Sequence, residues 1–442
     1  NTGLLKFHLY KLTREFGVYS PVRFIKAGIF AVLCLPGIMA AQPNDDSTAQ
    51  RQEPKNENFN SQAVQSTVPK SRVGDFLASP YLQVGPVFDS NIYAIPANEI
   101  DDVITVINAS VNLQSDWQQH KLNIDAWGAI GRYRDYDTEN YEDYGLSGDF
   151  RYDLAAKSNI FGGLGYQALH EDRSSQEELV GRRPTTYSRT DAVLGMSHSF
   201  GKLWTRLGLT RDTFDFDDTD ALIGIINNDD RDRNMDAAGI RFGYPVTQTV
   251  NLFAQAAYDQ REYDDSPEDN GFARNSDGSR IAAGLIVRPN NGLNMEFLVG
   301  SLNQKYKDQR FSDISEPDFG IDLAWRPSSN RRLSLLLDRR LEETTLADAS
   351  GFLNDMISAR YNQKLPYTLS ISAFGALSNL EYQGIERKDD LVSVGLGAKY
   401  AFSKLFFLAL DYSFLSRDSN DDIADYDRNK VFLSVGIEAQ DK

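Results

Sequence analysis

Cysteine and histidine are scarce in this sequence. The single cysteine, Cys34, falls within the first 41 residues, and only four histidines occur among the 442 residues. Once those first residues are removed, no disulfide, thiolate metal site or cysteine nucleophile is possible. Imidazole metal sites need several histidines brought together, so we expect no metal site and no cofactor.

Basic residues are also in short supply. The chain has 46 Lys and Arg against 63 Asp and Glu, a net charge of −17. Proteins that bind nucleic acid need basic surface to neutralise phosphates, so we expect no nucleic-acid partner. Catalytic motifs are missing too, since the sequence has no Gly-x-Ser-x-Gly elbow, no His-Glu-x-x-His and no glycine loop for phosphates. We therefore predict no catalytic residues and no enzymatic activity.

Long apolar runs are missing after residue 41. Residues 1–41 combine a basic stretch, a short apolar stretch and small residues near Ala40, which is typical of a cleaved signal peptide. Residues 42–77 are rich in Gln, Asn, Ser, Asp and Lys, and this composition predicts a disordered periplasmic tail. No later window holds the roughly eighteen apolar residues that a membrane helix needs.

The rest of the chain shows alternation of apolar and polar residues. In Tyr144–Leu154, every second position holds tyrosine, leucine, phenylalanine or one glycine, and the positions between them hold glycine, serine, aspartate and arginine. A period of two indicates strands with two different faces. These runs extend for roughly nine to fourteen residues, the length with which a tilted strand crosses a membrane, whereas strands of soluble sandwiches usually have about five or six.

The connections between these runs alternate between short and long. The short ones fall at residues 114–116, 156–158, 200–202, 245–248, 289–292, 327–330, 364–366 and 402–404, and the long, charged ones at 134–142, 171–186, 215–231, 263–278, 306–316, 383–390 and 416–428. Lipid cannot satisfy free strand edges, so a sheet that spans a membrane must close on itself. We therefore predict, over residues 78–440, an all-β fold: a transmembrane antiparallel up-and-down β-barrel of about 18 strands in the cell outer membrane, with short periplasmic turns and long extracellular loops.

Aromatic residues gather beside the predicted short turns. They are Trp117, Trp204, Tyr244, Trp325, Tyr367, Tyr400, Phe402 and Phe406. Aromatic rings favour the boundary between lipid and water, so we expect a periplasmic girdle, with ordinary packing at strand ends as the alternative.

The polar face of each strand is expected to line a water-filled lumen, because the apolar face must meet lipid. The predicted lumen-lining residues are Asp125, Trp127, Tyr133, Asp149, Arg151, Asp153, Arg206, Arg241, Arg261, Arg288, Asp322, Arg326, Arg340 and Arg360. Both signs of charge occur, which does not indicate selection for anions or cations. The charges also fit simple pairing along the wall. Trp127 and Tyr133 offer faces on which a sugar ring could stack, with packing under an inward-folded loop as the alternative.

The two ends of the predicted barrel carry motifs that are more specific than the strand pattern. Pro80–Tyr93 runs a strand into Asp89, Asn91, Ile92 and Tyr93, and Tyr426–Val435 forms the last strand. These segments resemble the ends of the "Putative beta-barrel porin 2" family, whose first strand runs into a D-x-N-[IV]-[FY] turn. The resemblance covers residues 78–438.

The resemblance implies a role in surface polysaccharide. Members of this family resemble outer-membrane components of exopolysaccharide and capsule export systems, which implies a conduit for a polysaccharide chain. The implied partners are a periplasmic polysaccharide export protein and the inner-membrane chain-length regulator, besides membrane lipid, lipopolysaccharide and the barrel assembly machinery. The alternative is a general diffusion porin or small-solute channel, and a structural anchor is a third. Porins usually have an inward-folded constriction loop, and no loop in this sequence is obviously of that kind.

Overall fold

The computed structural model describes residues 71–438, apart from 179–180, 222–223, 265, 268–270 and 291. The predicted signal peptide (1–41) and most of the predicted tail (42–70) lie outside the described residues. Residues 71–77 differ from the expected tail, because β1 (Ser71–Val73) pairs with β2, and β2 begins at Phe76. The first barrel strand therefore starts before the predicted boundary at residue 78.

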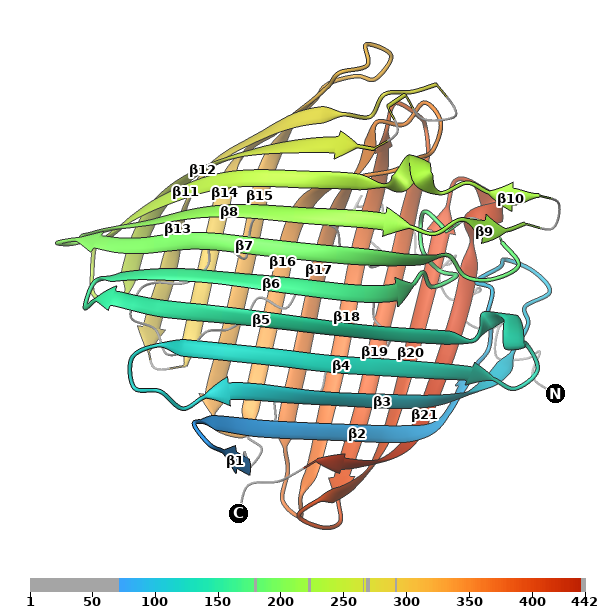
Figure 1. Cartoon of the computed structure of the whole chain (residues 1–442), viewed down its shortest axis with the longest axis horizontal. Coiled ribbons are helices and arrows are strands. Elements are labelled where there is room, and N and C mark those ends of the chain that lie inside the picture. Colours follow the sequence, from blue (N-terminus) through green and yellow to red (C-terminus); the bar gives the residue numbers. More distant parts are fainter. Residues whose placement is uncertain are drawn as a thin grey trace, which may run out of the picture.

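The described residues form a closed antiparallel barrel of 18 strands. In chain order they are β2 (Phe76–Asp89), β3 (Asp102–Ser115), β4 (Lys121–Tyr133), β5 (Tyr141–Ala155), β6 (Ser158–His170), β7 (Thr186–Phe200), β8 (Leu203–Phe216), β11 (Arg233–Pro245), β12 (Val250–Tyr263), β13 (Ser276–Asn290), β14 (Leu293–Tyr306), β15 (Ile314–Ser328), β16 (Arg331–Glu342), β17 (Gly351–Lys364), β18 (Leu369–Gln383), β19 (Lys388–Ala401), β20 (Phe406–Ser419) and β21 (Tyr426–Glu438). Each strand pairs with its neighbour in sequence, and β2 pairs with β21 to close the ring. In Figure 1 the near strands β3–β7 run across the far strands β17–β20, as tilted strands of a cylinder do.

Short and long connections alternate around the barrel, as the sequence predicts. The long connections gather at one end, and they hold the hairpin of β9 (Thr219–Asp220) and β10 (Ile225–Ile226), which projects beyond the barrel in Figure 1. They also hold three single-turn 3₁₀ helices, η1 (Asp137–Glu139), η2 (Asp229–Arg231) and η3 (Asp422–Ala424). The described residues include no helix with the length and hydrophobicity of a membrane span. The end with the long loops is called the outer end below.

The two faces of each strand differ in the way that the alternation predicts. On β5, Tyr144 and Leu146 are 54% and 58% exposed, although both are large and apolar. Asp143 and Arg151, at alternate positions of the same strand, turn to the other face, which is the barrel interior. Small apolar clusters also lie inside, for example Val87, Ile104, Val106 and Phe432 on β2, β3 and β21. The lumen is therefore lined by charged groups with apolar patches between them.

Seven of the eight residues predicted for the periplasmic girdle are exposed, as a girdle requires, and Trp204 is not. Trp117, Tyr244, Trp325, Tyr367, Tyr400, Phe402 and Phe406 are all exposed. Trp204 is buried and packs against Phe253 and Ile286 inside the barrel. Its indole lies over Gly243 of the next strand, where a Cβ atom would come within 2.1 Å of the ring. That glycine leaves room for the indole on the inner face.

Closure of the sheet predicts resistance to detergent. Every barrel strand has a hydrogen-bonded neighbour on both sides, so no edge is left for detergent to unzip. We expect unboiled protein in dodecyl sulfate to migrate differently from boiled protein, with strand-dominated circular dichroism. A mainly helical spectrum, or a single band at both temperatures with no strand signal, would contradict the barrel.

Candidate functional site

The loop between β6 and β7, residues 171–185, crosses the barrel interior. Its Glu177 carboxylate accepts hydrogen bonds from the Thr344 hydroxyl (2.8 Å) and the Thr345 backbone N–H (2.9 Å), both in the β16–β17 loop. Six strands separate β7 from β16 one way round the ring, and eight separate β17 from β6 the other way. The loop therefore reaches nearly to the opposite wall. We call residues 171–185 the crossing loop.

The start of the crossing loop is fixed to the last two strands. The Asp172 carboxylate lies 2.6 Å from the Arg428 guanidinium and 3.3 Å from the Lys430 ammonium, both on β21. The Ser174 carbonyl accepts a hydrogen bond from Arg417 of β20 at 2.6 Å. Burial alone would raise the pKa of Asp172, but the charges of Arg428 and Lys430 hold it well below its usual range. This anchor is therefore ionised at physiological pH.

Two ion pairs hold the first residues of the crossing loop to other outer loops. Arg231 of η2 makes a bidentate pair with Glu171 (2.7 and 2.9 Å). Arg173 makes a bidentate pair with Glu139 of η1, with both contacts at 2.8 Å, and also lies 2.7 Å from Glu178. The side chains of these five residues are all less than a tenth exposed. Since separating buried partners is costly, these pairs oppose movement of the loop.

The crossing loop contains one carboxyl group that favours its protonated form. Burial, reinforced by the neighbouring Glu171 carboxylate, raises the pKa of Glu178 to about 9, although Arg173 opposes the shift. Glu171 keeps the charge of the pair, because Arg231 outweighs the effect of burial and lowers its pKa. At neutral pH Glu178 is therefore a neutral group packed beside an ionised one.

This arrangement predicts that the crossing loop loosens at alkaline pH. Because the pKa of Glu178 is raised in the folded loop, protonated Glu178 stabilises the loop fully at pH values below about 4.5, the usual pKa of a glutamate. This stabilisation is lost as the pH rises through about 9. We expect the conductance of the reconstituted barrel to rise between pH 8 and 10. Glu178→Gln keeps a neutral side chain of the same shape, so its conductance is expected to stay constant over that range. Equal pH profiles for both proteins would refute this role of Glu178.

The family motif closes the barrel at its outer end. Arg428 of β21 makes a bidentate pair with Asp89 of β2 at 2.7–3.0 Å, and both side chains are almost fully buried. The Asn91 amide donates to the carbonyls of Ile95 (2.8 Å) and Asp427 (3.1 Å). Ile92 is fully buried next to it. Asp89 and Asn91 therefore join the first strand to the last, and Asp89 orients the arginine that holds the crossing loop.

Tyr93 completes the connection between the motif and the crossing loop. Its ring lies in the β2–β3 connection, 5.8 Å from the Arg173 guanidinium and edge-on to Tyr136. Burial raises the pKa of the Tyr93 hydroxyl, so it remains protonated. The residues of this motif thus join the first strand to the last and support the crossing loop.

A second outer loop, residues 343–350, is also fixed inside the barrel. Glu343 contacts Arg261 and accepts a hydrogen bond from the Tyr263 hydroxyl at 2.5 Å. Burial would raise the pKa of Glu343, but Arg261 and Tyr263 lower it. The fully buried Arg274 donates to the Leu346 carbonyl at 2.9 Å and to that of Ala349. The surface that receives Glu177 of the crossing loop is therefore itself held in place.

The predicted lumen residues share the inward register of their strands and are distributed around the wall. Ion pairs hold Arg151 to Asp153, Arg241 to Glu296, Arg261 to Glu343 and Arg340 to Asp338, and hydrogen bonds join Asp125 and Asp149 to Asn123 and Arg288 to Asn294. Arg206 stacks on Phe161 and Arg360 on Phe374, with 4.0 and 4.7 Å to the ring centroids. Asp322 and Arg326 lie on β15, on the face opposite the exposed Trp325. No group of three or more His, Cys, Asp or Glu in the described part of the chain is arranged to hold a metal ion.

The two aromatic candidates have different surroundings. Trp127 lies over Gly145 on β5, where a Cβ atom would be 2.6 Å from the indole nitrogen. Tyr133 packs against the apolar cluster of Val87, Val106 and Phe432. Only Tyr133 reaches a recess beneath the crossing loop, so the two rings do not form one stacking surface.

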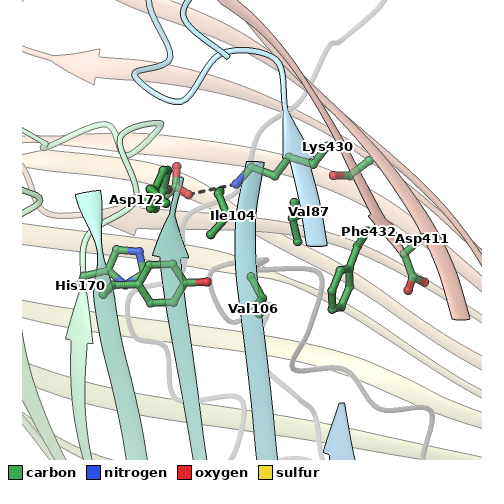
Figure 2. Close-up of a pocket in the computed structure, with 11 residues that line it drawn as sticks. Val87, Ile104, Val106, His170, Asp172, Asp411, Lys430 and Phe432 are labelled. Atoms are coloured by element: carbon green, nitrogen blue, oxygen red, sulfur yellow. Dashed lines mark hydrogen bonds and ion pairs between the residues drawn. The ribbon is translucent and has the colours of Figure 1, made fainter. Parts of the chain in front are cut away.

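That recess lies on the inner wall directly below the start of the crossing loop (Figure 2). It is a small, open recess lined by Val87, Ile104, Val106, Tyr133, Tyr141, His170, Asp172, Asp411, Ser413, Lys430 and Phe432. His170 stacks on Tyr141 at 4.0 Å, and its ring Nδ1–H donates to the Asp143 carboxylate at 2.8 Å. The recess therefore combines an apolar wall with an ammonium and carboxylates.

Sequence reasoning missed the crossing loop. Residues 171–186 were expected to be one of several charged outer loops, and no constriction loop was recognised. A charge run normally indicates a solvated segment, but here Glu171, Asp172, Arg173 and Glu177 meet partners that are distant in the sequence.

Comparison with known proteins agrees with this architecture. The family described as "Putative beta-barrel porin 2" matches residues 71–439. No curated protein matches the sequence significantly.

Solved structures with some similarity include two porins and one receptor. OccK3 (OpdO) of Pseudomonas aeruginosa has 15% identity and a TM-score of 0.42, covering 82% of this chain and 96% of that one. OccAB3 of Acinetobacter baumannii has 14% identity and a TM-score of 0.41, covering 83% and 99%. The siderophore receptor PirA of Pseudomonas aeruginosa has 7% identity and a TM-score of 0.41, covering 83% and 81%.

Proposed function

This chain belongs to the "Putative beta-barrel porin 2" family and is an outer-membrane β-barrel, and from that premise we propose that it is a diffusion channel for small solutes. The observation that carries the proposal is the crossing loop, which is anchored on both sides of the lumen by Asp172 and Glu177. A barrel of this size without such a loop would leave a wide aqueous channel. The loop narrows that channel from inside and leaves the strand pairing of the barrel unchanged.

The export of a polysaccharide chain, which the family resemblance implied, is not supported by the comparisons, and the alternative fits better. A moving polymer needs a continuous path at least as wide as a sugar chain for as long as it passes. Opening that path here would separate the buried pairs of Arg173 with Glu139 and of Arg231 with Glu171. Each such separation leaves a buried charge without its partner and costs about 3–5 kcal/mol. Small solutes need no such rearrangement.

The wall of the lumen supports the same proposal. Charges of both signs are neutralised locally, as in the pairs Arg151–Asp153 and Arg241–Glu296. Such a wall keeps the path hydrated without a deep potential well for one kind of ion. The porin family also gives indirect support for a non-enzymatic role. Under this proposal the partners are the surrounding lipid and lipopolysaccharide and the machinery that inserts the barrel.

Liposome swelling tests the proposed function. Purified barrel in liposomes is expected to admit monosaccharides and free amino acids quickly and to exclude oligosaccharides of increasing length. Liposomes without protein, and liposomes with boiled protein, give the baseline. No swelling above that baseline with any small solute would overturn the proposal, and so would equal rates for a monosaccharide and a long oligosaccharide.

A further inference from the structure

One part of the lumen wall departs from the local pairing of opposite charges. The strands β15, β16 and β17 are neighbours in the far wall of the barrel (Figure 1). At their periplasmic end the inward register holds Arg326, Arg332 and Arg360, one on each strand. The whole chain has a net charge of −17, so three cations on adjacent strands are a local exception.

The strand pairing brings these three side chains together. The register of β15 against β16 shifts between Trp325 and Ser328, which leaves Arg326 in a β-bulge opposite Arg332. On the other side of β16, Arg332 pairs with Asn362, and Arg360 is two residues away on the same strand. Arg332 and Arg360 are therefore diagonal neighbours, with Cα atoms about 7–8 Å apart.

Two of these guanidinium groups have no acid beside them. Within the described part of the chain, neither Arg326 nor Arg332 has an ion pair or a side-chain hydrogen bond. The charges of Arg326 and Arg360 both act on Arg332, and Asp322 of β15 is the acid that opposes them. Like charges on neighbouring strands repel each other and destabilise the sheet. An anion placed among the three arginines would replace this repulsion by attraction.

An aromatic ring orients the third arginine. The Arg360 guanidinium lies over Phe374 of β18, 4.7 Å from the ring centroid. Phe374 is the direct cross-strand partner of Arg360, so the ring and the guanidinium share the inner face. A stacked guanidinium keeps its N–H groups in its own plane, where they can meet a planar carboxylate.

The three arginines are accessible to solutes in the lumen. Arg326 is exposed, and Arg332 and Arg360 are only partly buried. On the other face of β15, Trp325 is 41% exposed, as expected of a residue at the periplasmic membrane boundary. The arginines therefore lie just inside the periplasmic mouth of the barrel.

We propose that Arg326, Arg332 and Arg360 form a binding site for the carboxylate of small anionic solutes. Arg332 donates from the centre of the group, Arg326 donates from the bulge, and Arg360 adds its oriented positive charge. Guanidinium groups suit this role because their fork of N–H donors matches the two oxygens of a carboxylate. A neutral solute gains no such attraction, and an amine is repelled. This inference rests on the proposed small-solute channel, for which it names small carboxylates as the class of solute.

Calorimetric titration of the folded barrel in non-ionic detergent tests the site independently of transport. The probes are succinate, its neutral diamide succinamide, and 1,4-diaminobutane, a cation of similar length. Succinate is expected to bind best. Arg332→Gln is expected to weaken succinate binding about threefold, and Arg326→Gln combined with Arg332→Gln about tenfold, as for solvent-exposed charge pairs.

The matched control is Arg331→Gln, which makes the same change of charge at the next residue, on the exposed outer face of β16. It is expected to bind succinate as the wild type does. Arg332→Gln removes a repulsion and no partner, so in urea unfolding it is expected to be at least as stable as the control. Equal binding of succinate and succinamide would overturn the site, as would an unchanged affinity in the double variant or an equal loss in Arg331→Gln.

Bilayer recordings of the same protein separate this inference from the proposed function. In a salt gradient, the double variant is expected to favour cations more than Arg331→Gln does, and succinate is expected to reduce the current of the wild type. Ion conductance without any succinate binding would refute the site and leave the channel standing. Succinate binding without conductance or liposome swelling would refute the channel and leave the site standing.

Discussion

Replacing residues 172–184 by a short glycine–serine linker is expected to raise the single-channel conductance at least about twofold, because a barrel of this strand number otherwise encloses an open aqueous channel. The replacement removes Asp172, Arg173 and Glu177, which fix the loop to β21, η1 and the β16–β17 loop. The sheet itself is untouched, since β6 ends at His170 and β7 begins at Thr186. Planar bilayer recordings measure the effect directly.

The matched control shortens an outer loop that does not enter the lumen. Residues 421–424 hold η3, and Ile423 in that turn is 81% exposed. The same linker in their place is expected to leave the conductance unchanged. If the crossing-loop variant, folded and heat-modifiable, conducts no better than this control, the loop does not limit the channel.

Arg428→Met is expected to destabilise the barrel by about 3–5 kcal/mol, the usual effect of breaking a buried pair by removing one partner. The guanidinium is the bidentate partner of Asp89 and also contacts Asp172, and the side chains of Arg428 and Asp89 are 2% and 0% exposed. Its loss leaves two carboxylates with a single cation near them among the described residues, Lys430, at 3.7 and 3.3 Å. Urea unfolding of the refolded barrel in detergent gives the change in free energy.

Two further variants make this result specific. Arg132→Met removes an arginine whose pair with Glu142 is well exposed, so its cost is expected to stay below about 1 kcal/mol. Combining Asp89→Asn with Arg428→Met removes one of the stranded charges and is expected to recover part of the loss. Equal unfolding free energies for Arg428→Met and Arg132→Met would show that Asp89 and Arg428 do not hold the first and last strands together.

The barrel was predictable because its constraints are local. A strand that meets lipid on one face and water on the other must alternate, and this alternation is visible in any ten residues of β5. The same register placed Arg241 and Asp149 on the inner face. Trp204 shows the limit of this reasoning, because its position beside a turn suggested the membrane interface. The space above Gly243, which comes from another strand, decided its orientation.

The crossing loop was not predictable because its constraints are distant. Asp172 and Arg428 are 256 positions apart, and Glu177 and Thr344 are 167 apart. Nothing local to the loop distinguishes carboxylates that meet buried arginines from carboxylates that meet water. The family motif shows the same limit, since the role of Asp89 depends on β21 at the other end of the barrel.

A clean deletion of the gene, scored for both surface polysaccharide and uptake of small solutes, tests the central claim most directly. The account predicts a normal amount of extracellular polysaccharide and slower uptake of small solutes, with wild-type protein in trans restoring the rate. Loss of the polysaccharide with unchanged solute uptake would contradict the proposed channel and favour export.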